Sequence, residues 1–126
     1  MSDETANVRC MVEDVEAAVG FYTGYLGFSV ISSAGSPFAD LRRGALRLLL
    51  SHPDSAAGRP MPDGRKPGPG GWNRIHLIVD DIVVEVERLP GEGIGFRNDI
   101  VPGRGGSQIV LDDPFGSPVE LFQPAR

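Results

Sequence analysis

Residues 74–81 read RIHLIVDD, and the alternation of apolar and polar side chains in this stretch decides the fold. Successive side chains of a strand point to opposite faces, so this stretch predicts a strand with one face in a core. That face would carry the apolar side chains Ile75, Leu77 and Val79. The opposite face would present the cation of Arg74 and the imidazole of His76. Asp81 then offers a helix N-cap, and residues 82–89 (IVVEVERL) are predicted to form a short helix.

The same arrangement occurs once before in the chain. Residues 7–12 read NVRCMV, and Asp14 follows them 67 positions before Asp81. The helix predicted after Asp14 spans residues 15–26, with one apolar stripe at helical spacing formed by Val15, Val19, Tyr22 and Leu26. Gly27 would end this helix, since glycine adopts the positive φ that a helix C-terminus favours. The chain is therefore a repeat of two strand-to-helix units.

Three further strands follow each helix. In the first half they are predicted at residues 28–32, 38–42 and 47–51, and in the second half near Phe96 and at residues 108–111 and 119–122. The predicted fold class is α+β, with two tandem βαβββ modules whose curved mixed sheets form a cup.

The boundary between the two modules is predicted from composition. Half of residues 53–72 are Pro or Gly, which sustain neither a helix nor a central strand. We expect a single domain over residues 1–126, with module one at 6–52, a linker at 53–72 and module two at 73–124.

Composition excludes several classes of protein. The net charge of −5 argues against a nucleic-acid partner, although it would suit a cationic ligand. No apolar run approaches the length of a membrane span, and no signal peptide is evident. Cys10 is the only cysteine, which excludes an internal disulfide and fits a reducing compartment. We expect a cytoplasmic protein.

Several motifs together resemble the vicinal oxygen chelate superfamily, which contains glyoxalase I, extradiol dioxygenases, fosfomycin-resistance enzymes and bleomycin-resistance binding proteins. They are residues 12–14 (VED), 21–22 (FY), 26–28 (LGF), 79–81 (VDD) and 113–121 (DPFGSPVEL). The resemblance covers residues 7–124 and implies the paired βαβββ fold. It leaves the activity open, because one fold hosts many activities.

The resemblance also implies where a divalent metal would be held in the enzymes of this family. The corresponding positions here are Asn7, Leu49, Arg74 and Glu120. Glu120 alone is a good ligand, since Leu49 has no lone pair to offer and Arg74 is a permanent cation. His76 with Glu120 is the alternative donor pair. We expect no metal and no cofactor.

The resemblance instead implies binding of a bulky, partly aromatic small molecule such as an antibiotic, sequestered for drug resistance. We expect aromatic stacking by Trp72, Phe38 and Phe122. The other expected contacts with the ligand are Asn7, Arg9, Arg47, Leu49, Arg74, His76, Gln108 and Glu120. No nucleophilic arrangement such as Ser/His/Asp is evident, so no catalytic residue is predicted. The relatives are commonly homodimers, and we expect a homodimer here.

Alternatives stay open for these residues and for the activity. Arg74 and Glu120 would form an ion pair that either contacts a ligand or only replaces the metal structurally. His76 could be a hydrogen-bonded core residue, and Trp72 could pin the linker to the sheet. The rival function is an enzyme: a lyase or dioxygenase with an altered metal site, or a metal-free isomerase that uses Glu120 or His76 as a base.

Overall fold

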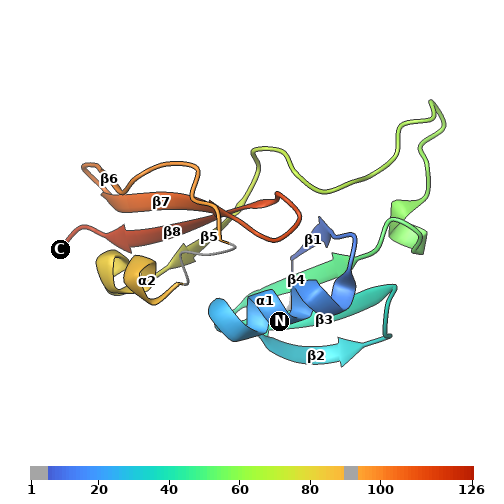
Figure 1. Cartoon of the computed structure of the whole chain (residues 1–126), viewed down its shortest axis with the longest axis horizontal. Helices are drawn as coiled ribbons and strands as arrows, with labels where there is room; N and C mark the ends of the chain where they lie inside the picture. The colour runs from blue at the N-terminus through green and yellow to red at the C-terminus, as the bar shows by residue number, and fades with distance from the viewer. Residues whose placement is uncertain (1–5, 90–93) are drawn as a thin grey trace, which may run out of the picture. The chain divides into compact units, whose positions relative to one another are not determined.

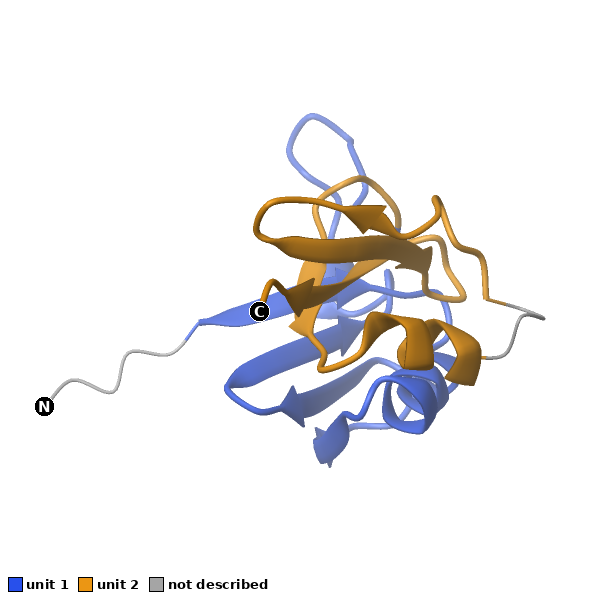
Figure 2. Ribbon diagram, turned by 90° about the vertical axis from the view of Figure 1, so that its left-hand side faces the viewer, with its two compact units in different colours: residues 1–69 blue, residues 70–126 orange. Residues whose placement is uncertain are grey.

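The computed structural model describes residues 6–89 and 94–126. The chain divides into two compact units, Met1–Pro69 and Gly70–Arg126, which are coloured separately in Figure 2. The described residues of each unit form one four-stranded mixed sheet and one α-helix, labelled in Figure 1. The predicted α+β fold with two βαβββ modules is thus confirmed.

The first unit contains β1 to β4 and α1. Their bounds are Asn7–Met11 for β1, Val15–Tyr25 for α1, Ser29–Ser33 for β2, Phe38–Arg43 for β3 and Leu46–Ser51 for β4. The strand order is β1-β4-β3-β2, with β1 parallel to β4 and the other neighbours antiparallel. Parallel strands need a crossover connection, and α1 with the β2–β3 hairpin provides it.

Helix α1 begins at the predicted residue and ends one residue before the predicted Leu26. Oδ1 of Asp14 accepts a hydrogen bond from the backbone N–H of Ala17 at 3.0 Å, which satisfies one of the unpaired donors of the first turn. Gly27 has a φ of 72°. The helix packs on β3 and β4 and forms the core of this unit. The fully buried residues of this core include Ala18, Tyr22, Ala39, Leu41, Leu48 and Leu50.

The second unit repeats this order with shorter elements. It contains β5 (Ile75–Ile78), α2 (Ile82–Arg88), β6 (Val101–Pro102), β7 (Gly106–Asp112) and β8 (Pro118–Pro124). The strand order is β5-β8-β7-β6, with β5 parallel to β8. Asp81 caps α2 by accepting from the backbone N–H groups of Val83 and Val84 at 3.1 and 3.2 Å. The cap and the parallel strand pair therefore recur in both units.

The strand predicted near Phe96 is wrong. Phe96 forms only an isolated bridge to Leu111, and the third strand of this unit is the two-residue β6. The cause lies at Asn98, whose side-chain Oδ1 accepts the N–H of Val110 at 2.9 Å. A side chain takes the place of a backbone carbonyl in the ladder, so regular pairing stops.

The segment between β4 and β5 is not uniformly irregular. It contains a 3₁₀ turn, η1 (Ala56–Gly58), and a tight turn in which the N–H of Met61 donates to the carbonyl of Arg65 at 2.8 Å. At its end, the N–H of Gly70 donates to Oγ of Ser117 at 3.1 Å. Among the described residues, no helix combines the length and the apolar character that crossing a bilayer requires.

Candidate functional site

Each sheet has a face covered by its helix and an opposite face, which we call the open face. Alternation assigns the helix side of the second sheet to buried apolar residues such as Leu77, Val119 and Leu121. Its open face carries His76, Glu120 and Phe122. The predicted ligand-binding residues divide between the two units, and each group is described by itself.

Glu120 of β8 is the centre of the group in the second unit. It is directly opposite His76 of β5 in the sheet register, and only 7% of its surface is exposed. Nε of Arg74 donates to Oε1 of Glu120 at 2.9 Å, while Nε2 of His76 lies 3.3 Å from Oε2. The ion pair predicted between Arg74 and Glu120 is therefore present. The carboxylate faces a cation on one oxygen and an imidazole on the other.

Phe122 extends this group along β8. Its ring centroid lies 4.7 Å from that of His76, with 35° between the ring planes. Gln108 of β7 is its direct partner in the register. A side chain at Gly106 would come within 2.7 Å of Cζ of Phe122 and 2.2 Å of the carbonyl of Gln123, so only glycine leaves room for the ring. Phe122 and His76 thus form a partly exposed aromatic surface beside Glu120.

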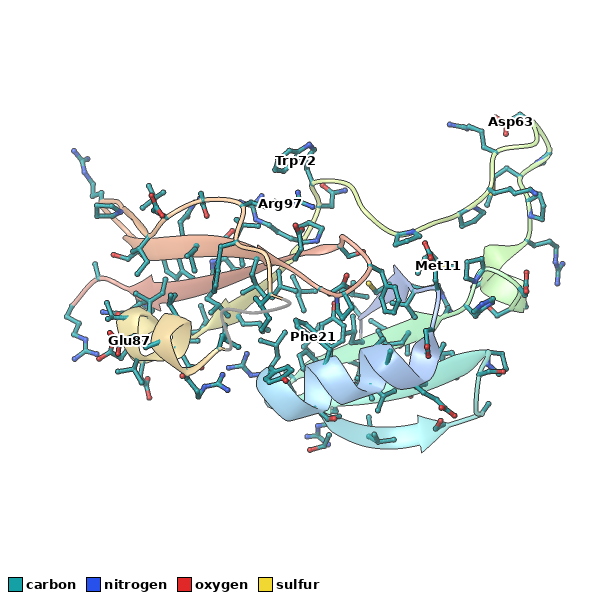
Figure 3. The ribbon with its side chains drawn as sticks, viewed as in Figure 1. Met11, Phe21, Asp63, Trp72, Glu87 and Arg97 are labelled. Atoms are coloured by element: carbon teal, nitrogen blue, oxygen red, sulfur yellow. The ribbon has the colours of Figure 1, made fainter. Side chains whose placement is uncertain are left out.

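Trp72 lies at the other end of the group. Nη1 of Arg74 is 3.5 Å from the carbonyl oxygen of Trp72, which links the aromatic residue to the Arg74–Glu120 pair. The exposed fraction of the Trp72 surface is 72%. The guanidinium carbon of Arg97 lies 4.5 Å from the centroid of the Trp72 ring (Figure 3). A ring supported by a cation and open to solvent can stack on a flat ligand.

Arg97 is a residue that the sequence analysis missed. Its Nε donates to Oδ1 of Asp112 at 2.7 Å, and its Nη1 and Nη2 donate to the carbonyls of Gly71 and Gly116, both at 3.0 Å. It therefore joins the backbone before Trp72 to the β7–β8 turn. No local sequence pattern predicts these contacts of Arg97, because its partners are 15 to 26 positions away in the sequence.

In the first unit, the open face carries the other predicted residues. In the sheet register Asn7 is opposite Arg47, Arg9 is opposite Leu49, and Phe38 is opposite Ser51. Asn7 and Arg9 are exposed, and the remaining predicted residues of this face are half-buried. The face therefore mixes cationic and apolar side chains.

Both arginines of this face that were predicted to contact the ligand have defined partners. Arg47 forms a two-point ion pair with Asp40, an acid of β3 that is 5% exposed and that the sequence analysis missed. The hydrogen bond and the Coulomb attraction from Asp40 raise the pKa of Arg47 above its ordinary value. Nη1 of Arg9 donates to the hydroxyl of Ser51 at 2.7 Å.

The residues at the four positions where the resemblance places metal ligands do not fit a divalent metal. Leu49 has no donor atom, and Arg74 places a permanent cation 2.9 Å from Oε1 of Glu120. His76 and Glu120 supply only two donors, fewer than the three protein ligands of catalytic zinc sites. Within residues 6–89 and 94–126, no three His, Cys, Asp or Glu side chains gather in a way that could hold a metal ion.

The comparisons with known proteins agree with the fold. The sequence model of the Glyoxalase/Bleomycin resistance protein/Dioxygenase superfamily matches residues 6–121. None of the curated proteins matches the sequence significantly.

Many solved structures have a similar fold. A lactoylglutathione lyase from Agrobacterium tumefaciens has a TM-score of 0.75 at 19% identity, covering 98% of this chain and 95% of that one. TnmS3, an antibiotic binding protein from Streptomyces sp. CB03234, has a TM-score of 0.74 at 22% identity, covering 98% of both chains. A member of the same superfamily from Sphaerobacter thermophilus DSM 20745 has a TM-score of 0.74 at 25% identity, also covering 98% of both.

Proposed function

Since the chain belongs to the Glyoxalase/Bleomycin resistance protein/Dioxygenase superfamily, we propose that it binds a planar, partly aromatic small molecule without a metal. In its cell it would sequester an antibiotic or a related natural product stoichiometrically. The likeness to TnmS3, an antibiotic binding protein, supports this class of ligand.

The observation that carries the proposal is that both carboxylate oxygens of Glu120 have partners within the protein. In a metal-dependent member of the family this carboxylate would need an oxygen available for the ion. Here Oε1 accepts from Arg74 and Oε2 faces His76, so the acid is neutralised by the protein's own cation. The fold is kept, while the residues at the metal positions are unsuited to a metal.

The exposed ring of Trp72 gives the ligand a place to stack. Stacking on an aromatic ring contributes about 1 kcal/mol beyond the buried area. Arg74 and Glu120 would then orient polar groups of the ligand, because they lie beside the backbone of Trp72. Phe122 and His76 provide further aromatic surface along the same sheet.

A screen of planar natural products read by tryptophan fluorescence tests this function. Trp72 is the only tryptophan, so any quenching on binding has a single origin. We expect saturation at a fixed stoichiometry and recovery of the ligand chemically unchanged after long incubation. Formation of a new product over many turnovers would contradict sequestration, even if binding were tight.

One contact favours a second candidate, a metal-free isomerase. An imidazole 3.3 Å from a carboxylate is an arrangement that a general base can use. Turnover by the wild-type protein that is lost in His76→Gln would support the isomerase over the binding protein. The same chromatography of the incubated ligand separates the two functions.

A further inference from the structure

The open face of the first sheet has a charge opposite to that of the whole chain. The chain carries a net charge of −5, whereas this face presents Arg9, Arg42 and Arg47 against the single acid Asp40. Arg42 and Arg47 are direct cross-strand partners. Like charges in that position destabilise a sheet unless an anion balances them.

The protein's own groups balance these cations unequally. Arg47 is paired with Asp40, and Nε of Arg42 donates to the carbonyl of Gly44 at 3.0 Å. Arg9 instead donates to the neutral hydroxyl of Ser51, and no carboxylate of the described residues forms an ion pair with it. Within the described residues, Arg9 and Arg42 are thus the two cations of this face that donate to neutral groups. They differ in their surroundings, because Arg9 is opposite the apolar Leu49 whereas Arg42 is opposite a second cation, Arg47.

The hydrogen bond to Ser51 fixes the position of Arg9. Ser51 is fully buried, so its hydroxyl is a rigid anchor for one nitrogen of the guanidinium. A guanidinium has five N–H donors in a planar fork. With one donor held by Ser51, the others can bind a carboxylate or phosphate at two points.

Apolar side chains lie on one side of this cation. Leu49 is the direct partner of Arg9 on β4, and Phe38 is opposite Ser51 on β3. Met11 lies next to Arg9 on the same face of β1 and pairs with Ser51. All three are half-buried. A ligand that places its anionic group on Arg9 would therefore lay an apolar ring over Leu49 and Phe38.

We propose that the open face of the first sheet is a binding site for an aromatic acid, with Arg9 as the contact to its carboxylate or other oxyanion. This inference rests on the proposed function and deepens it, because Arg9, Leu49 and Phe38 are among the expected ligand contacts, and it names an acidic group as part of the ligand. It also replaces the expectation of a cationic ligand, which the total charge alone suggested.

A matched pair of probes tests the site on the full chain. Naphthalene-2-carboxylate and naphthalene-2-carboxamide share the ring and differ in charge. Calorimetry should show the carboxylate binding about tenfold more tightly than the amide, since an ion pair with Arg9 replaces a hydrogen bond from the guanidinium to a neutral oxygen. The preference should fall as salt is raised. Equal affinity for the two probes, or no binding of the carboxylate, overturns the inference.

Variants test whether the preference for the carboxylate over the amide depends on Arg9. Arg9→Gln should abolish it and leave the affinity for the amide unchanged, and Arg9→Lys should retain part of it. Arg59→Gln makes the same charge change in the exposed 53–72 segment and should leave the preference intact. If the preference persists in Arg9→Gln, the site is wrong. Loss of binding in Trp72→Ala alone would concern the proposed function of the second unit.

A second measurement keeps the test independent of whether Arg9→Gln folds. Titration of the wild-type protein with naphthalene-2-carboxylate should shift the side-chain Nε–H resonance of Arg9 in an NMR spectrum. The amide should shift it much less. Absence of any selective shift at Arg9 would contradict the inference even if the variant were unstable.

Discussion

Arg74 and Glu120 pair on the open face of the second sheet, with Nε of the arginine 2.9 Å from Oε1 of the carboxylate. The arginine thus meets the carboxylate at the position where the family resemblance implies a metal. The side chain of Glu120 is 9% exposed and that of Arg74 29%, so the pair is largely withdrawn from water. A carboxylate in such a place needs its cation.

Loss of the cation should therefore destabilise the protein. In Arg74→Met we expect the free energy of unfolding to fall by about 1–3 kcal/mol. The buried carboxylate of Glu120 would lose its arginine, and of its two ion-pair partners His76 would remain. Urea denaturation measures the free energy of unfolding. The double variant Arg74→Met with Glu120→Leu should recover most of the loss. A single variant as stable as the wild type would mean that the pair contributes nothing to folding.

Replacing the cation by a donor should create metal affinity. Arg74→His adds an imidazole beside His76 and Glu120, which would complete three protein donors. We expect this variant to bind Zn²⁺ in calorimetry, whereas the wild type should show no near-stoichiometric metal by elemental analysis when purified without an affinity tag. Arg74→Gln is the control that removes the charge without adding an imidazole. Stoichiometric metal in the wild type that vanishes in Glu120→Ala would contradict the metal-free proposal.

Trp72 should carry part of the affinity for a planar ligand. Trp72→Ala should weaken binding about tenfold, equivalent to about 1.4 kcal/mol, through lost stacking and lost area. Trp72→Phe should lose less, since a ring remains. Binding of these variants is followed by calorimetry, because they lack the fluorophore. Unchanged affinity in Trp72→Ala would remove the stacking contact and leave the other contacts standing.

Arg97 should act by positioning Trp72. Arg97→Lys keeps the charge but cannot reproduce the bonds to Asp112, Gly71 and Gly116 together. We expect faster local motion of Trp72, seen as a lower fluorescence anisotropy of the free protein, and weaker ligand binding. Arg88→Lys changes an exposed arginine of α2 in the same way and should leave both unchanged. A merely structural role for Arg97 would lower stability without altering the anisotropy of the folded protein.

Local sequence was enough to predict most of the fold. Asp14 and Asp81 are followed by helices that they cap, and the alternation in residues 74–81 places Leu77 in a core and His76 on the opposite face. These features depend on neighbours a few positions apart. They are visible in the sequence because capping and strand alternation are local rules.

The parts that sequence could not predict depend on distant partners. Arg97 is held by groups 15 to 26 positions away, and Asn98 interrupts a strand by bonding to Val110. Asp40 reads as an ordinary polar residue of a hairpin until its pairing with Arg47 is seen. These contacts depend on the register between strands, and the register cannot be read from local patterns in a single sequence.

The separation of strand pairs into two units bears on how the chain folds during synthesis. The first sheet has all its strands once Ser51 has been made, and none of its pairs needs a residue of the second unit. Domains of a nascent chain commonly fold in order from the N-terminus, and local contacts favour rapid folding. Residues 6–51 can thus close their hydrogen bonds once they have left the ribosome, before the second unit is complete. Slow codons that pause synthesis after β4 has left the ribosome would be expected to raise the yield of folded protein, whereas slow codons within β3 or β4 would not.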